Sequence, residues 1–188
     1  MSGAVSRDDS KVKIEQLLAE FYDSSQQFHH LAEFESATNL PTPYSGLLDH
    51  QAHMTVTVES FWGESVNVVV HRTKTNDHWY SREITLTTDA SNKVVQYGIV
   101  RLNTKALEPV VWSRIEDQGT PLGRVLIEHN VLREVHLCEL WSVQAGDSLA
   151  QHFGVQPNTQ TFGRTALIYC DGEPAIELLE IVSPISDH

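Results

Sequence analysis

The sequence predicts an α+β fold built on a single six-stranded antiparallel sheet with helices packed around it. Apolar and polar residues alternate at period two over the segments that we expect to form the sheet. Short turn-forming sequences join neighbouring segments, which predicts hairpins, and helical segments fall between groups of strands. Parallel neighbours would need a crossover helix between each pair, so these observations favour antiparallel pairing. The expected strands are 54–61, 66–72, 79–88, 93–102, 133–143 and 164–182, the last being a hairpin.

The first part of the chain is expected to contain one helix. Residues 1–10 are polar and predict a flexible tail. A helix starting near Asp9 or Ser10 follows, because apolar side chains then recur at helical spacing. These side chains are Ile14, Leu17, Leu18 and Phe21. The sequence LPTPYSG at 40–46 breaks the chain, and residues 47–54 predict a short helix or a loop.

Two hairpins are predicted next. Residues 54–61 alternate apolar side chains with threonine and glutamate, and residues 66–72 carry three valines on one face. The sequence WGES joins them. The segments 79–88 and 93–102 form the second pair, joined by the turn DASN.

Helices separate these hairpins from the last strands. A helical segment is expected around 105–117, and the sequence TPLGRVLIEH predicts another helix. The strand at 133–143 comes next. Asp147 and Gly154 then mark the N-cap and the end of a short helix, and DGEP marks the turn of the closing hairpin.

Length and composition predict one globular domain, which we place at residues 11–188. The chain has 188 residues, 40% of them hydrophobic and 20% charged. A formal net charge of -12 with only 13 lysines and arginines argues against a nucleic-acid partner. No apolar run approaches the roughly 20 residues that span a bilayer, so we expect a cytoplasmic protein with no membrane partner. We expect it to be a monomer or a small homo-oligomer.

Familiar catalytic and metal-binding motifs are missing from the sequence. It contains no GxGxxG, P-loop, GxSxG, HExxH or CxxC pattern. His50 and His53 have a spacing that could hold a metal on a helix, but no carboxylate or cysteine partner is placed to join them. Cys138 and Cys170 are expected to be buried free thiols. We therefore expect no metal and no cofactor.

Arg82 interrupts an apolar face. Counting in twos along WYSREITL, it shares that face with Tyr80, Ile84 and Leu86. A buried guanidinium is costly unless an acid or a bound anion accompanies it. Arg82 could therefore pair with a buried glutamate, or it could hold an anionic ligand.

Two further features could complete a pocket around such an anion. Thr120 is a candidate N-cap and Pro121 the first helical residue, so the amides of Leu122 and Gly123 would be free at a helix N-terminus. An acid on the last strand is the second feature, since Glu180 lies on an apolar face there.

The last strand offers two candidates for this acid. Glu180 shares its face with Ile176, Leu178 and Val182, whereas Glu177 lies on a face that is equally apolar. Periodicity alone does not choose between them.

The order of these segments resembles the chorismate lyase (chorismate pyruvate-lyase) superfamily, including its divergent prokaryotic branch and the related ligand-sensing domain of GntR-type repressors. The resemblance is carried by LLDHQAHMT (47–55), WYSREI (79–84), TPLGRVL (120–126) and DGEPAIELLEIVSP (171–184). It covers most of the chain after the first helix. It implies a chorismate lyase-like fold in which an internal ligand site is enclosed beneath helical flaps.

The resemblance also implies roles for individual residues. Arg82 matches an arginine that grips a carboxylate, and Leu122, beside Gly123, matches a residue whose backbone amide assists. Met54 matches a residue that lines the site, and Glu180 matches the essential acid. As a chorismate lyase, with Glu180 and Arg82 as its catalytic residues, the chain would eliminate pyruvate from chorismate. The product would be 4-hydroxybenzoate, formed without a cofactor and used in aromatic acid and ubiquinone biosynthesis.

Two departures from the family pattern leave other functions open. One extra residue between Pro174 and Glu180 is either absorbed by a β-bulge or reassigns the acid to Glu177. The segment before Met54 is also longer. The alternatives are a non-catalytic binding domain for an aromatic carboxylate and a family enzyme that acts on a different carboxylated substrate.

Overall fold

The computed structural model describes residues 11–186. Its elements are α1 (Ile14–Leu18), α2 (Ser25–Leu31), β1 (Ala32–Ala37), α3 (Tyr44–Leu48), α4 (Met54–Trp62), β2 (Val66–Asn76), β3 (Trp79–Thr88), β4 (Val94–Asn103), the 3-10 helix η1 (Thr104–Ala106), α5 (Pro109–Glu116), α6 (Leu122–Glu128), β5 (Arg133–Ala145), α7 (Asp147–Phe153), β6 (Gln160–Cys170) and β7 (Glu173–Val182). The expected tail at 1–10 and the expected helix start near Asp9 or Ser10 lie outside the described residues.

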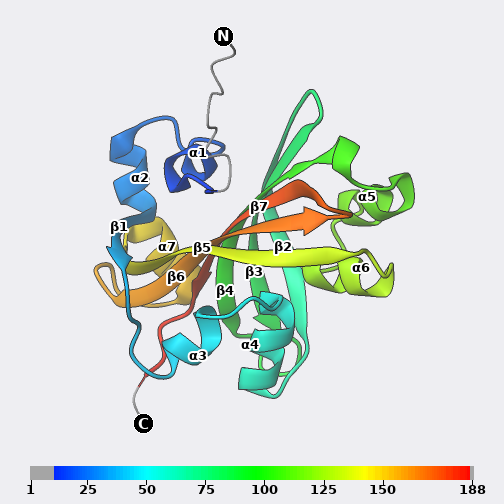
Figure 1. Ribbon diagram of the computed structural model, residues 1–188. Coiled ribbons are helices and arrows are strands. Elements are labelled where there is room, and N and C mark those ends of the chain that lie inside the picture. The colour runs from blue at the N-terminus through cyan, green and yellow to red at the C-terminus, as the bar shows by residue number, and fades with distance from the viewer. Residues whose placement is uncertain (1–10, 187–188) are drawn as a thin grey trace.

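One sheet of seven strands forms the centre of the molecule (Figure 1). The strand order is β1-β5-β6-β7-β4-β3-β2, and every neighbouring pair is antiparallel. The predicted α+β fold with a single antiparallel sheet is confirmed, with seven strands instead of six.

The strand predicted at 54–61 is wrong, because this segment is the helix α4. The sequence MTVTVESF fits both periods, and burial follows the helical one: Met54, Thr55 and Val58 are buried, whereas Val56 is 49% exposed. The β-propensity of threonine and valine is overridden by packing on the sheet. Gly63, in the left-handed conformation at φ 67°, ends the helix.

The edge strand β1 is an element that was not predicted. It follows α2 without a turn sequence between them, and most of its side chains are exposed or half-buried. Its pairing with β5 runs from Ala32 opposite Ala145 to Ala37 opposite Leu140. A short strand with this composition carries no strong periodic signal.

Helices cover both faces of the sheet (Figure 1). On one face, α1 and α7 pack with Tyr97, Ile99 and Leu179 in a continuous apolar cluster. On the other face, α5 and α6 pack on Val100 and Leu178, and α4 packs beside them on β2 and β3. Each fully buried leucine or isoleucine in these layers contributes about 1.5 to 3 kcal/mol. The sheet is therefore a rigid platform with two covered faces.

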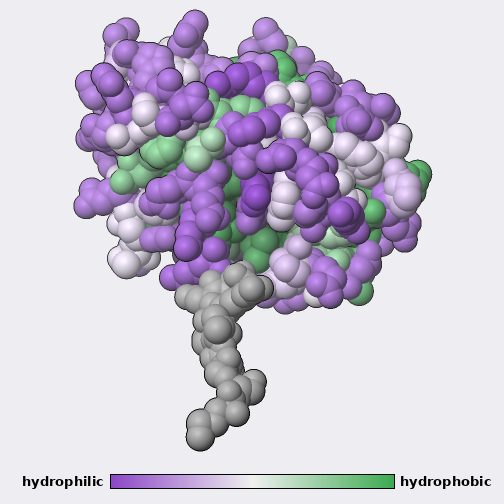
Figure 2. Space-filling view, turned by 90° about the horizontal axis from the view of Figure 1, so that it is seen from above, coloured by the Kyte–Doolittle hydropathy of each residue, from purple (hydrophilic) through white to green (hydrophobic). Residues whose placement is uncertain are grey.

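The surface seen in Figure 2 is mostly hydrophilic, with hydrophobic residues in small separate patches. This agrees with the acidic composition. Among the described helices, none is long and apolar enough to cross a membrane.

Candidate ligand site

Arg82 lies on β3, the strand next to the edge strand β2, on the face of the sheet covered by α5 and α6. Its Cα is paired with Thr73 on β2 and with Val100 on β4. The side chain is 0% exposed, and its Nη1 donates to the carbonyl oxygen of Ile115 in α5 at 3.5 Å. Nε and Nη2 are also buried, and neither has a hydrogen-bond partner within residues 11–186. Burial of this kind costs the fold free energy, since both donors lose water without gaining an acceptor.

The two unpartnered nitrogens belong to one edge of the guanidinium. Arg72 shows what this edge binds elsewhere in the same protein: its Nε donates to Glu83 Oε2 at 2.6 Å and its Nη2 donates to Glu83 Oε1 at 3.0 Å. Two parallel hydrogen bonds of this kind are the usual way in which arginine holds a carboxylate or a phosphate. The free edge of Arg82 therefore has the right shape and charge for an oxyanion.

Tyr80 lies two residues before Arg82 on the same face of β3. Its hydroxyl oxygen is buried and has no hydrogen-bond partner in the described part of the chain. Its ring contacts Trp112 of α5, with the ring centroids 5.0 Å apart. Burial raises the pKa of Tyr80, while the charge of Arg82 and the nearby side chain of Gln118 lower it. A protonated Tyr80 hydroxyl adds a third donor to this region.

A small cavity lies beside Arg82, between the sheet and helices α4 and α6. Its volume is about 30 Å³, which is room for one or two water molecules. Four of the five residues predicted for the site line this cavity, namely Met54, Leu122, Gly123 and Glu180. Arg82 is outside the lining, next to Ile84, which lies within it. The structure thus brings four predicted residues together and places the fifth at the border.

The roof of the cavity is a close contact between α4 and α6. Gly123 lies so near the start of α4 that an added Cβ would be 3.2 Å from both the Cβ of His53 and Oγ1 of Thr55. The helix α6 begins at Leu122 with Pro121 as its cap residue, so the expected cap at Thr120 is displaced by one residue. The two helices close over the sheet at this seam.

Glu180 is held by an arginine that the sequence analysis missed. Arg164 on β6 lies directly across from Glu180, and its Nε donates to Glu180 Oε2 at 2.7 Å. The Arg164 guanidinium also donates to the carbonyl oxygens of His50 at 2.8 Å and Ala52 at 3.0 Å. Arg164 therefore neutralises the acid and fastens the segment that leads into α4. A signal for Arg164 exists, because it shares a strand face with the buried Ala166 and Ile168.

The structure separates the two candidate acids. Glu177 accepts a hydrogen bond from Arg101 at 2.9 Å and does not line the cavity, whereas Glu180 does. The extra residue in β7 is absorbed by a register shift against β6, which falls between Ile168 and Tyr169.

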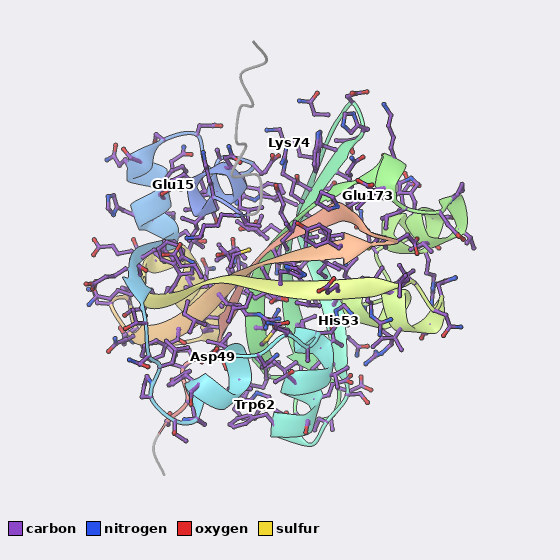
Figure 3. The ribbon with its side chains drawn as sticks, in the orientation of Figure 1. Glu15, Asp49, His53, Trp62, Lys74 and Glu173 are labelled. Carbon is purple, nitrogen blue, oxygen red and sulfur yellow. The ribbon has the colours of Figure 1, made fainter. Side chains whose placement is uncertain are left out.

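His53 stands where α4 meets β5 and α6 (Figure 3). Arg133 of β5 donates from Nε to Nε2 of His53 at 2.6 Å. Burial, together with the charges of Arg133 and Arg164, lowers the pKa of His53 to about 4. The ring is therefore neutral at physiological pH. Within residues 11–186, no group of three histidine, cysteine, aspartate or glutamate side chains is arranged to hold a metal ion.

Comparison with solved structures finds the same fold in proteins of low sequence identity. The effector domain of PhnF from Mycobacterium smegmatis matches with a TM-score of 0.54 at 14% identity, over 70% of this chain and 88% of that chain. PhnF from the same organism matches at 0.53 and 14%, over 71% of this chain and 64% of that chain. The possible transcriptional regulator YydK from Bacillus subtilis subsp. subtilis str. 168 matches at 0.51 and 9%, over 95% and 90% of the two chains. This chain shares its fold with an effector domain.

The fold comparison confirms the predicted chorismate lyase-like architecture in its coarse form. The chain spans 64% of the length of PhnF and most of the length of the isolated effector domain. No protein-family model matches the sequence, and no curated protein matches it.

The expected activity is wrong. The solved structures that share the fold are an effector domain and a possible transcriptional regulator. These structures contradict the expected carbon-oxygen lyase reaction on chorismate, its product 4-hydroxybenzoate and its place in ubiquinone biosynthesis. The expectation that nucleic acid is no partner is wrong for the same reason, because transcriptional regulators act on DNA.

Proposed function

We propose that this domain binds a small carboxylate or a related oxyanion at Arg82 and serves as the effector-binding domain of a transcriptional regulator. The observation that carries the proposal is the free edge of Arg82, with Nε and Nη2 both buried and unpartnered in the described residues. The charge is on the helix-covered face, where a bound anion would satisfy both donors at once. Tyr80 would add its hydroxyl to the same anion.

The shared fold supports this role. We place the chain, as one domain over residues 11–188, in the chorismate lyase-like superfamily, on the branch that senses ligands. We infer that another domain or subunit reads the DNA, and that the protein works in the cytoplasm.

The small cavity indicates how a ligand would act. A volume of about 30 Å³ is far below the roughly 300 Å³ or more of a typical ligand pocket. An organic acid would therefore have to part α4 from α6 at the contact between Gly123 and Thr55. Ligand binding and helix displacement are then one event, which is what a sensor requires.

Isothermal titration with phenylacetate, hexanoate and phenyl phosphate tests the proposal. Arg82→Met removes the charge, and Arg82→Lys keeps it without the planar edge. We expect Arg82→Met to abolish binding and Arg82→Lys to restore only part of it, because an ammonium cannot make the paired hydrogen bonds. Arg114→Met is the matched control, since Arg114 is exposed on α5. Binding that survives in Arg82→Met, or the absence of binding for all three anions, would refute the proposal.

A further inference from the structure

A second polar group that the sequence analysis missed lines the same cavity. Gln96 on β4 is 3% exposed, and its Oε1 is buried without a hydrogen-bond partner in residues 11–186. A buried amide oxygen that has no donor costs the fold free energy. A role in binding a ligand would account for a glutamine that the sheet itself does not use.

Glu180 and Gln96 lie on the neighbouring strands β7 and β4. The strand pairs place Gly98 opposite Glu180, and Gln96 is two residues from Gly98 on the same face. Oε2 of Glu180 accepts a hydrogen bond from Arg164, and its Oε1 takes part in no hydrogen bond within the described residues. Gln96, Gly98 and Glu180 all line the cavity, and the side chain of Ile84 packs over Gly98, 3.5 Å from the position that a Cβ would take.

Arg82 stands at the other end of this floor. Gln96, Gly98 and Val100 follow one another on one face of β4, and Val100 is the residue paired with Arg82. The four residue steps along β4 from Gln96 to Val100 separate their Cα atoms by roughly 13 Å. The long side chains of Gln96 and Arg82 fill part of this distance. A ligand of about six or seven heavy atoms in length would reach from one end to the other.

We propose that Gln96 and Glu180 recognise a hydroxyl group at the far end of the ligand, so that the effector is a hydroxylated organic acid. This inference rests on the proposed binding of an anion at Arg82. A hydroxyl donates one hydrogen bond, which the unpartnered Oε1 of Gln96 would accept, and Oε1 of Glu180 on the neighbouring strand is a second acceptor that the same hydroxyl could use instead. Because Arg164 is already paired with Glu180, a second carboxylate would find no free cation among the described residues at this end and would lie against the Glu180 carboxylate, which disfavours dicarboxylates.

Matched pairs of probes that differ by one hydroxyl test the inference. These are 4-hydroxyphenylacetate against phenylacetate, and 6-hydroxyhexanoate against hexanoate, each titrated by calorimetry. We expect the hydroxylated member of at least one pair to bind about 10-fold or more tightly, because its partner leaves buried polar groups unpaired. Gln96→Leu should abolish this preference, and Gln151→Leu, at an exposed position of α7, should keep it.

The outcomes separate the two proposals. Equal affinity within both pairs, or a preference that persists in Gln96→Leu, overturns the role of Gln96 while Arg82-dependent binding still stands. No binding by any of the four probes overturns this inference, and it overturns the anion site as well if phenyl phosphate also fails to bind. If Gln96→Leu does not fold, Gln96→Met, which keeps an unbranched side chain of similar length, gives the same comparison.

Discussion

Arg82 and Glu83 are consecutive residues of β3 whose buried side chains lie on opposite faces of the sheet. Glu83 is fully partnered: it accepts hydrogen bonds from Arg72, from Tyr22 at 2.7 Å and from Tyr97 at 2.6 Å. Arg82 has two donors without partners in the described residues. The charge of Glu83 is therefore paired within the fold, whereas the charge of Arg82 is not. Removing the Glu83 charge should lower the stability of the protein, and removing the Arg82 charge should raise it.

Glu83→Gln should destabilise the protein by roughly 3 kcal/mol, because it leaves Arg72 without its counter-charge beside two tyrosine hydroxyls. Urea denaturation at pH 7 measures the loss, and Glu35→Gln, at an exposed position of β1, is the control. Burial raises the pKa of Glu83, but the hydrogen bonds from Arg72, Tyr97 and Tyr22 outweigh it and lower the pKa to about 2.

The same pair of variants should show a pH dependence. The folded-state pKa of Glu83 is below its ordinary value, so its stabilising effect is complete above that value and is lost as the pH falls toward 2. The difference between the unaltered protein and Glu83→Gln should therefore shrink in acid. A difference that stays constant from pH 6 to pH 2.5 would contradict the assigned pKa.

His53 should make the protein less stable in mild acid. Its pKa is lowered to about 4 in the folded state, whereas an unfolded histidine titrates near 6.5. Its contribution is therefore complete above about pH 6.5 and is lost as the pH falls through 4, because only the unfolded chain binds the proton in that interval. Denaturation between pH 4 and 7 should show a shallower slope for His53→Asn than for the exposed control His29→Asn. Equal slopes would argue against a neutral, buried ring.

Strands were predicted correctly where the apolar pattern fits only the two-residue period of a strand. The prediction was wrong where the pattern also fits the 3.6-residue period of a helix. Residues 54–61 match a strand and a helix equally well, and only their position over β2 and β3 selects the helix. The burial of Arg82 was foreseen because a charge on an apolar face is a strong signal. The same signal marks Arg164, but its pairing with Glu180 depends on the register between β6 and β7, which no local pattern contains.

Gly146→Ala should be strongly destabilising. Its Cβ would lie 2.4 Å from the carbonyl oxygens of His29 and His30, and backbone atoms of α2 cannot turn aside as a flexible side chain could. We expect a loss of roughly 3 kcal/mol or more. Gly46→Ala is the matched control, since nothing lies within 4 Å of its added Cβ and alanine favours the helix α3. Thermal unfolding that gives both variants the same midpoint would show that α2 is not fixed against the start of α7.

Arg82→Met should make the ligand-free protein more stable while it abolishes anion binding. The guanidinium is 0% exposed and burial lowers its pKa, so we expect the site to disfavour the charge when no anion is present. Methionine fills similar space and needs no hydrogen bonds, so replacing the unpaired charge should add about 1 to 3 kcal/mol to the free energy of unfolding. A purely structural arginine would behave in the opposite way, as Glu83 on the other face is expected to do. Urea denaturation of Arg82→Met without ligand therefore separates a binding residue from a structural one, and a clear loss of stability would assign Arg82 to the fold instead of the ligand.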